Sequence, residues 1–415
     1  LMYYQTPMKL QILNNIAREG LDTFEGNGFH LHKTDAEDDY LGIVLRSFNL
    51  RDLPLRESLL GIARAGAGTN NINVDECSKH GVVVFNTPGA NANAVKALVI
   101  CSLILSKRDI LNGNTSINLM QAEDLSEEEL SKKVETMKKQ FVGNEIKGKS
   151  IGIVGLGAIG SLVAEQALAL GLKVKGFDPG LTVETAIRLP GSIKHNSKIE
   201  DTVKDVDYVS LHLPLNKSTS GFFNEKILAT VSQGTTLINF SRGGIINEED
   251  VLSALDSGKL EKYVTDFPTK KLISRLRNEN DVLIFPHLGA STKESEVNCA
   301  VMACNQLKNF IKDGQIENSV NFPNISSLKR CKHRLFIANV NEPGIISLIT
   351  ETIAEEKINI SEFVNKSRQD VACNIIDTDD EISVECLTKL RDIKGVTKVR
   401  ICLLYTSDAA DEIVR

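Results

Sequence analysis

The stretch "GIVGLGAIGSLVAEQALALGLKVKGFD" (residues 152–178) decides how the central part of the chain folds. An apolar run leads into three glycines, Gly155, Gly157 and Gly160, and the residues around 159–170 have a helical pattern. A second apolar run then ends at Asp178. This order predicts a strand, a glycine-rich turn, a helix and a second strand, which together form a dinucleotide-binding unit.

Each glycine of this unit has its own expected role. One allows a tight turn, one allows the backbone to approach a pyrophosphate closely, and one allows the helix to pack closely on the strand. The free N–H groups at the helix N-terminus favour bound phosphate. Asp178 lies where it would accept hydrogen bonds from a ribose 2′-hydroxyl and repel a 2′-phosphate, so we expect NAD rather than NADP. A glycine-rich turn without a ligand is the alternative, and the neighbouring strand, helix and acidic residue disfavour it.

Outward from this unit, near-continuous apolar runs alternate with helical segments such as 159–170 and 248–256. Such runs are typical of parallel strands that are covered on both faces, and the alternation predicts a doubly wound α/β sheet of the Rossmann type. The runs are "KSIGIVGLG", "LKVKGFDP", "DYVSLHLP", "TTLINFSRGG", "KYVTDFP" and "DVLIFPH".

The flanking segments predict two further domains. Residues 8–96 show a weaker strand–helix alternation, and helices at 94–106 and 299–314 leave and re-enter this part of the chain. We therefore expect an NAD domain at 97–286, inserted into a smaller flavodoxin-like α/β domain at 8–96 and 287–320, with a cleft between the two. Residues 331–401 follow a β-α-β-β-α-β pattern of the ferredoxin type.

Two other segments have a simpler interpretation. The lysine-rich, acidic stretch 121–140 is expected to form an exposed helix with a solvated face. The last segment, 402–415, resembles the translated read-through of a sequencing adapter, and we expect it to be a non-native tail.

Composition excludes several classes of function. The net charge of -6 over 415 residues argues against nucleic acid as a partner, and no apolar run reaches membrane-spanning length. The first residues lack the pattern of a secretory signal, and Met8 is the expected start. The eight cysteines contain no C-x-x-C pair, so we expect reduced thiols in the cytoplasm and no metal site.

Three residues that follow predicted strands are the candidates for chemistry. Ligands of open parallel sheets bind beyond the carboxyl ends of the strands, and Arg242, Asp266 and His287 all fall at that edge. An arginine can hold a carboxylate with two hydrogen bonds, and a histidine can accept a hydroxyl proton. Asp266 is expected to anchor the nicotinamide carboxamide. Taken singly, the three could instead be a turn residue, a loop cap and a packed histidine.

Several motifs resemble the D-isomer-specific 2-hydroxyacid dehydrogenase family, in its phosphoglycerate branch with a C-terminal ACT domain. The resemblance extends from residue 8 to about 401. It is carried by "RAGAGTNNINVDECSKHGVVVFNTPGANANAV" (64–95), "GIVGLGAIG" (152–160), "LHLPLNKSTSGFFN" (211–224), "NFSRGGIINE" (239–248), "VTDFP" (264–268) and "PHLGAST" (286–292).

The resemblance implies a role for each matching residue. Arg242 would bind the substrate carboxylate, and His287 would be the general acid and base. The implied cofactor contacts are Gly155, Gly157, Ala158, Ile159, Gly160, Asp178, His212, Pro214, Thr219, Asn239, Ser241, Asp266 and Gly289. The implied substrate contacts are Ala67, Gly68 and Asn91, with Arg46, Ser47 and Arg64 around a phosphate.

One departure from the family pattern concerns the partner of His287. The family usually has a glutamate after the strand that carries Asp266, whereas this chain has Lys270 and Lys271 there. Glu279 precedes the last strand and is expected at the opposite edge, about 17 Å away. A nearby ammonium would favour a neutral imidazole, which still serves as a base. The alternative is that both lysines only face solvent.

The C-terminal segment resembles ACT domains, which bind amino acids. In this branch the ligand that the resemblance implies is L-serine, and the matching residues here are Asn339, Asn341 and Asn359. The family's histidine is missing from "NVNEPG", which weakens the case for serine. A module that only assembles a homodimer or homotetramer is the alternative.

The implied activity is the NAD-dependent oxidation of 3-phospho-D-glycerate to 3-phosphooxypyruvate, which begins L-serine biosynthesis. Two alternatives stay open. The first is another D-2-hydroxyacid dehydrogenase, acting on glycerate or 2-hydroxyglutarate. The second is a non-catalytic, NAD-sensing regulatory protein on the same fold, for which the missing glutamate would be a sign of lost catalysis.

Overall fold

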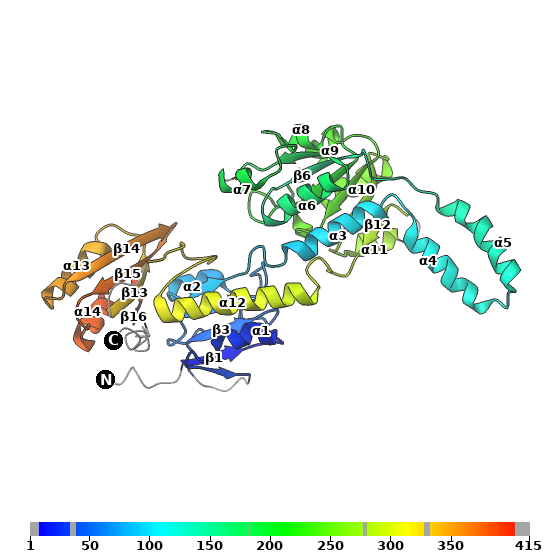
Figure 1. Cartoon of the computed structure of the whole chain (residues 1–415). Coiled ribbons are helices and arrows are strands. Elements are labelled where there is room, and N and C mark those ends of the chain that lie inside the picture. The colour runs from blue at the N-terminus through cyan, green and yellow to red at the C-terminus, as the bar shows by residue number, and fades with distance from the viewer. Residues whose placement is uncertain (1–7, 34–38, 182, 277–279, 328–332, 403–415) are drawn as a thin grey trace, which may run out of the picture. The chain divides into compact units, whose positions relative to one another are not determined.

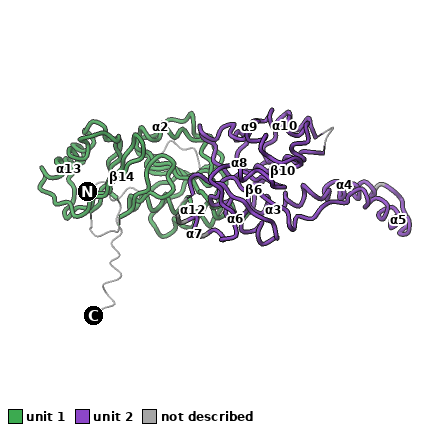
Figure 2. Tube along the Cα trace, turned by 90° about the horizontal axis from the view of Figure 1, so that it is seen from above, with its two compact units in different colours: residues 1–91, 293–415 green, residues 92–292 purple. Residues whose placement is uncertain are grey.

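The computed structural model describes residues 8–33, 39–181, 183–276, 280–327 and 333–402. The chain divides into two compact units, one of residues 92–292 and one of residues 1–91 with 293–415 (Figure 2). We call them the nucleotide unit and the outer unit. The expected tail, apart from Cys402, lies outside the described residues.

The nucleotide unit is built on a seven-stranded sheet that is parallel throughout (Figure 1). Its order is β12-β11-β10-β9-β6-β7-β8, which is the Rossmann order with one strand added after the sixth. The strands are β6 (Ser150–Val154), β7 (Lys173–Phe177), β8 (Lys194–His195), β9 (Tyr208–Leu211), β10 (Thr235–Asn239), β11 (Leu260–Thr265) and β12 (Val282–Ile284). The predicted doubly wound sheet is therefore confirmed.

Helices cover both faces of this sheet and form two separate cores, as continuous apolar strands require. The helices are α3 (Ala92–Leu105), α6 (Ala158–Ala169), α7 (Val183–Arg188), α8 (Ile199–Val203), α9 (Glu225–Thr230), α10 (Glu248–Asp256) and α11 (Lys270–Arg275). Short 3₁₀ turns occur at Met120–Ala122, Lys138–Phe141 and Gly243–Ile245.

A helical hairpin projects from the nucleotide unit (Figures 1 and 2). It consists of α4 (Ile110–Leu119) and α5 (Glu127–Met137), and neither helix buries a residue. Ser126 and Glu129 form a capping box at the start of α5, which explains why this polar segment is helical without a core. The expected exposed helix within 121–140 is present, whereas α4 was not predicted.

The outer unit begins with a parallel five-stranded sheet in the order β2-β1-β3-β4-β5, the flavodoxin-like order that we expected. The strands are β1 (Met8–Ile12), β2 (Phe29–His32), β3 (Gly42–Leu45), β4 (Gly61–Arg64) and β5 (Val83–Phe85). The helices are α1 (Arg18–Leu21), α2 (Val74–Lys79) and the long α12 (Lys293–Asp313), with a 3₁₀ turn at Asp22–Phe24.

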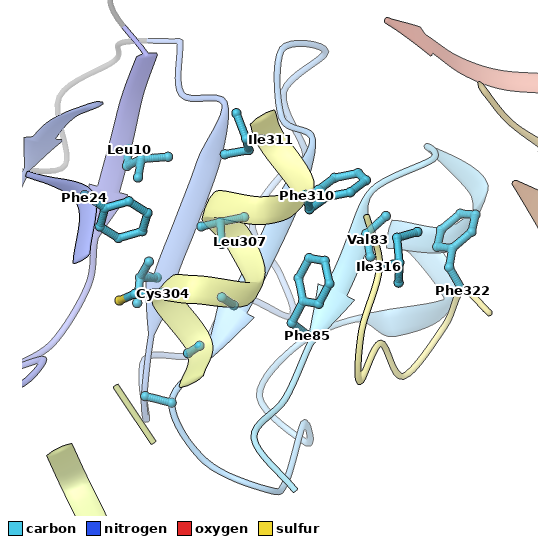
Figure 3. Packing of buried hydrophobic residues seen from close by; sticks show 14 of the residues in the cluster. Leu10, Phe24, Val83, Phe85, Cys304, Leu307, Phe310, Ile311, Ile316 and Phe322 are labelled. Atoms are coloured by element: carbon cyan, nitrogen blue, oxygen red, sulfur yellow. The ribbon is translucent and has the colours of Figure 1, made fainter. Parts of the chain in front are cut away.

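Helix α12 belongs to the core of the outer unit although it lies far along the chain from the sheet. Figure 3 shows Leu307, Phe310 and Ile311 of α12 among side chains of the sheet such as Leu10 and Phe85. Its burial against the sheet is the reason why this helix returns to the first domain, as the sequence indicated.

The C-terminal part of the outer unit is an antiparallel sheet in the order β14-β15-β13-β16. Its elements are β13 (His333–Val340), α13 (Ile345–Glu355), β14 (Ile360–Arg368), β15 (Val371–Thr378), α14 (Val384–Asp392) and β16 (Val396–Ile401). The predicted β-α-β-β-α-β order of the ferredoxin type is confirmed. The two helices cover one face of the sheet.

Two buried arginines connect this sheet to the C-terminal end of α12. Arg334 forms a fully buried ion pair with Asp377 and donates a hydrogen bond to Asp313 O at 3.3 Å. Arg400 donates to the carbonyl oxygens of Phe310 and Ile311, where a cation offsets the helix dipole. Cys402, expected to belong to the tail, is instead buried in the same core.

The boundaries between the units differ from those expected. They fall at 92 and 292 rather than at 97 and 286, because α3 packs against α6 and because residues 287–289 bond to Asp266. The C-terminal sheet also shares a core with the first domain, so the chain forms two units rather than three.

Candidate active site

The glycine turn lies at the topological switch point of the nucleotide sheet, between β6 and β9, where open α/β sheets bind ligands. Gly155 has a φ of +94°, and a Cβ there would lie 2.5 Å from His212 O. A Cβ on Gly160 would overlap the carbonyl oxygen of Gly155. The two positions therefore need glycine for the turn and for packing, as predicted.

The space around Gly157 is open, unlike the crowded space around Gly155 and Gly160. A Cβ there would find no atom within 4 Å, so the open space lies directly over the backbone. Helix α6 starts at Ala158, next to Ile159, and Gly157 supplies no side-chain cap for its first N–H groups. This open, positively polarised helix start fits a pyrophosphate.

Asp178 follows β7 and is held by two backbone N–H groups. Leu156 N donates to one carboxylate oxygen at 2.8 Å, and Gly180 N donates to the other at 2.8 Å. Each oxygen keeps acceptor capacity for a ribose hydroxyl. A carboxylate fixed at this place suits NAD and repels a 2′-phosphate.

His212 follows β9 on the other side of the switch point. The side chain is half-buried, and this burial lowers the pKa of His212 to about 4, so the imidazole is neutral near pH 7. One ring nitrogen lies 2.9 Å from Ser210 Oγ, while the buried Nδ1 has no partner among the described residues. An orphaned polar atom at this position is consistent with a ligand next to it.

Thr219 and Pro214, also expected on the adenine side, bond to each other: the Thr219 hydroxyl donates to Pro214 O. This bond closes the 214–219 turn, so the Thr219 hydroxyl already has a structural use. Its contact with the cofactor stays a prediction.

The three candidate catalytic residues follow the carboxyl ends of β10, β11 and β12. After β10, Asn239 accepts hydrogen bonds from the N–H and Oγ of Ser241 and donates one to Arg242 O. The Arg242 guanidinium donates to Ser241 O at 2.6 Å and is half-buried. Asn239 and Ser241 therefore fix the backbone that carries Arg242.

Asp266 is the buried centre of this group, only 1 % exposed. Burial raises the pKa of Asp266 above its ordinary value, while the hydrogen bond from Gly289 and the electrostatic influence of the nearby His287 and Arg242 act against that rise. Gly289 N donates to Oδ2 at 2.8 Å, and Oδ1 has no partner among the described residues. The free oxygen is the acceptor that a nicotinamide carboxamide needs.

His287 lies at the surface of the nucleotide unit in a backbone conformation that non-glycine residues seldom adopt, with a φ of +51°. Its N–H is shared between Phe285 O at 3.0 Å and Asp266 O at 3.2 Å. Its ring meets the ring of Phe267 edge-on, with centroids 5.3 Å apart. Strain of this kind concentrates at functional positions.

The two lysines that replace the family's glutamate lie at the start of α11 and are exposed. Lys271 forms an ion pair with Glu249 of α10. Between residues 270 and 292 as described, no hydrogen bond or ion pair joins either lysine to His287. Their role therefore stays a prediction, and Glu279 lies outside the described residues.

The expected substrate loops lie in the outer unit and are held by two asparagines that we did not predict. Asn14, with a φ of +68°, accepts hydrogen bonds from the N–H groups of residues 46–48 at 3.3, 2.9 and 2.7 Å. Asn71 donates to Arg46 O and accepts from Arg64 Nε at 3.1 Å. In the sequence, Asn14 is marked only by its place after a predicted strand, and Asn71 by its place within the 64–95 motif.

The glycine-rich loop before α2 is fixed by the segment after β5. Asn86 donates to Ala67 O at 2.7 Å, and Thr87 N donates to Gly66 O at 3.2 Å, one residue before Ala67 and two before Gly68. Asn91 has a buried Oδ1 without a partner in the described chain, as expected of a residue that meets a ligand.

The three asparagines of the expected effector site do not come together within one chain. Asn339 and Asn341 lie at the end of β13 next to the β14–β15 turn, where Asn341 donates to Gln369 O. Asn359 precedes β14 and bonds to Asp379 at the opposite end of the sheet. Seven strand residues separate the ends, about 23 Å.

The described residues contain no cluster of three side chains suited to a metal ion, and none of their helices is long and apolar enough to cross a membrane.

Comparisons with known proteins agree with this geometry. The family model described as "D-isomer specific 2-hydroxyacid dehydrogenase, NAD binding domain" matches residues 116–289. The D-3-phosphoglycerate dehydrogenase of Bacillus subtilis is 31% identical over 347 residues, which cover 83% of this chain and 60% of that protein. The enzyme of the same name from Haemophilus influenzae is 26% identical over 420 residues and covers 96% and 98%.

Two solved structures extend the comparison. The NAD+-bound 3-phosphoglycerate dehydrogenase of Entamoeba histolytica has a TM-score of 0.58 at 26% identity, covering 76% of this chain and 99% of that one. A glyoxylate reductase from Paecilomyes thermophila has a TM-score of 0.62 at 25% identity with the same coverage. With its NAD cradle and its Arg242–Asp266–His287 group, the nucleotide unit is similar to the NAD-binding domain of the D-isomer-specific 2-hydroxyacid dehydrogenase family.

Proposed function

We propose that the protein oxidises 3-phospho-D-glycerate to 3-phosphooxypyruvate with NAD, the first step of L-serine biosynthesis. The observation that carries the proposal is the grouping of three side chains at the ends of β10, β11 and β12. Asp266 is buried there, and Arg242 and His287 both lie close enough to affect its pKa. The near full-length similarity to D-3-phosphoglycerate dehydrogenases supports this choice of substrate.

In this mechanism the residues of the chain bind the acid and move one proton. When bound, NAD would supply the hydride acceptor; the turn at Gly155–Gly160, Asp178 and the free oxygen of Asp266 are the groups that would hold it. The Arg242 guanidinium binds the substrate carboxylate with two hydrogen bonds, which fixes the 2-carbon. An imidazole nitrogen of His287 takes the proton of the 2-hydroxyl as the carbonyl forms.

The loops of the outer unit would bind the other end of the substrate. Arg46, Ser47 and Arg64 supply cations and donors for a phosphate, and residues 66–68 with Asn91 supply backbone and amide groups. Asn14 and Asn71 hold these loops in place. A phosphate recognised by arginines is the feature that separates phosphoglycerate from glycerate.

The test is a side-by-side assay of NADH formation from 3-phosphoglycerate, D-glycerate and D-2-hydroxyglutarate. We expect 3-phosphoglycerate to have the highest kcat/KM. A preference for either unphosphorylated acid would replace the substrate and keep the family. NAD binding without turnover of any of the three would favour the regulatory protein.

We further propose that the chain forms a homodimer through the α4–α5 hairpin. Leu119 is 70 % exposed and Ile117 is 45 % exposed, although both are large and apolar. A projecting hairpin without buried residues gains stability when a second copy covers it. A homotetramer would need a second interface, for which the C-terminal sheet is the candidate.

The C-terminal sheet is proposed to be an ACT domain that binds L-serine through Asn339, Asn341 and Asn359. Within one chain these residues lie at opposite ends of the sheet. A shared site would therefore need the C-terminal sheets of two chains. Titrating L-serine to about 10 mM against initial rates tests this coupling. Unchanged rates would leave the sheet as an assembly module.

A cytoplasmic location is proposed from the cysteines. The seven that the structure describes are all free, and six of them are buried. Burial raises the pKa of Cys77 and Cys304 to about 12, which keeps these thiols protonated and unreactive.

A further inference from the structure

The candidate phosphate site carries a carboxylate of its own. Arg46 Nη1 lies 2.7 Å from Glu296 Oε1, in the first turn of α12. The two side chains are 39 % and 47 % exposed, so the pair is open to solvent and to a ligand. Both residues belong to the outer unit, although 250 positions separate them in the sequence.

The position of Arg46 does not depend on this ion pair. Its backbone is fixed by Asn14 Oδ1, and its carbonyl accepts a hydrogen bond from Asn71, which also binds Arg64. The loop therefore keeps its place without Glu296. What Glu296 changes is the charge around the guanidinium, which a bound anion would meet.

We propose that Glu296 is a specificity-determining residue that competes with the phosphate of the substrate for Arg46. The proposal rests on the proposed function, because it takes Arg46 as a phosphate contact. A phosphate dianion about 5 Å from a carboxylate in water-like surroundings is repelled enough to weaken its binding about tenfold. An uncharged 3-hydroxyl, as in glycerate, meets no such repulsion.

Glu296 thus lowers the preference for the phosphorylated acid below the value that Arg46 and Arg64 alone would give. It acts on the phosphate through the charge around Arg46 and touches no reacting atom. Its removal should alter KM for the phosphorylated substrate and leave kcat nearly unchanged.

The experiment compares Glu296→Gln with a matched control, Glu294→Gln. Glu294 lies in the same first turn of α12 and is exposed, and its side chain has no ion pair in the described chain. A third variant, Glu296→Asp, keeps a carboxylate. Each is assayed as the full chain with 3-phosphoglycerate and D-glycerate at low and high ionic strength.

We expect Glu296→Gln to lower KM for 3-phosphoglycerate about tenfold at low salt, with KM for D-glycerate and both kcat values within twofold of wild type. The effect should shrink at about 0.5 M salt, because salt screens exposed charges. Glu296→Asp and Glu294→Gln should stay within about twofold of wild type. An unchanged KM, a higher KM, or an equal drop in Glu294→Gln would each overturn the proposal.

Inorganic phosphate separates this proposal from the proposed function. If the wild type does not oxidise 3-phosphoglycerate, the proposed function fails. The Kd of inorganic phosphate, measured by calorimetry on the same full-length proteins, then decides the role of Glu296. A Kd about tenfold lower in Glu296→Gln alone supports competition, and equal values in all variants reject it. Thermal unfolding of each variant verifies that the fold is kept.

Discussion

At the scale of single residues, Asp266 explains how the candidate site is held together. It accepts a hydrogen bond from Gly289 N, its carbonyl accepts one from His287 N, and its charge faces Arg242 and His287. A buried carboxylate of this kind destabilises the fold unless cations or ligands neutralise it. Keeping this hydrogen-bond acceptor in place for the nicotinamide therefore lowers the free energy of unfolding.

Asp266→Asn tests this cost. Because burial raises the pKa of Asp266, the contribution of this group to stability is most favourable below its ordinary pKa and is lost as the pH rises through the raised value. The melting temperature of the variant, relative to wild type, should therefore increase as the pH rises from about 3.5, below the ordinary pKa of a carboxyl group, to about pH 8. A difference that stays constant with pH would contradict the assigned cause.

The two lysines give a second prediction at this scale. If an ammonium acts on His287, Lys270→Ala or Lys271→Ala lowers kcat or shifts its pH profile by a measurable amount. Glu249→Gln is the matched control for Lys271, because it removes the partner of the ion pair and keeps the ammonium. If both lysine variants have wild-type kcat at every pH, neither lysine belongs to the mechanism.

At the scale of elements, the glycine turn and α6 show how much of the site the sequence could predict. The motif, the Rossmann order and the flavodoxin-like order all follow from local patterns, because continuous apolar strands and 3.6-residue helices repeat along the chain. The positions of Asn14, Asn71 and Glu296 in the site do not follow from local patterns. Each depends on contacts between residues that are tens to hundreds of positions apart, which no local pattern records.

The same turn allows the ligand and the fold to be tested separately. Gly157→Ala places a methyl group in open space over the helix start, so the melting temperature should stay within about 2 °C while NAD binding weakens at least about tenfold. Gly160→Ala forces overlap with Gly155 O and should destabilise the protein by about 2–5 kcal/mol.

NADH fluorescence titration and thermal unfolding measure the two effects. Equal affinity for NADH in Gly157→Ala and wild type would mean that the pyrophosphate does not approach this backbone.

At the scale of the whole molecule, the two units have cores of their own, yet the chain crosses between them at 92 and 292. The sequence indicated both crossings from the helices that became α3 and α12. It misplaced them by a few residues, because the hydrogen bonds that assign 287–289 to the nucleotide unit arise only in the folded protein. It also separated the C-terminal domain, which in the structure shares a core with α12.

The oligomer is the prediction that belongs to this scale. Light scattering after size exclusion should give twice the chain mass of 45.5 kDa for wild type, or a larger even multiple. Charges at the exposed apolar positions, in the double variant Ile117→Asp and Leu119→Asp, should halve the mass of the assembly, with the fold kept. A monomeric wild type, or a variant of unchanged mass, would remove the hairpin from the interface.

The central claim is that His287 moves the hydroxyl proton beside a bound NAD. The most direct measurement is the rate of NADH formation from 3-phosphoglycerate by His287→Gln, with the affinity for NADH determined on the same preparation. We predict that kcat falls by about 10²–10⁴-fold while the Kd of NADH stays within twofold. A kcat within threefold of wild type, at unchanged NADH affinity, would contradict the account.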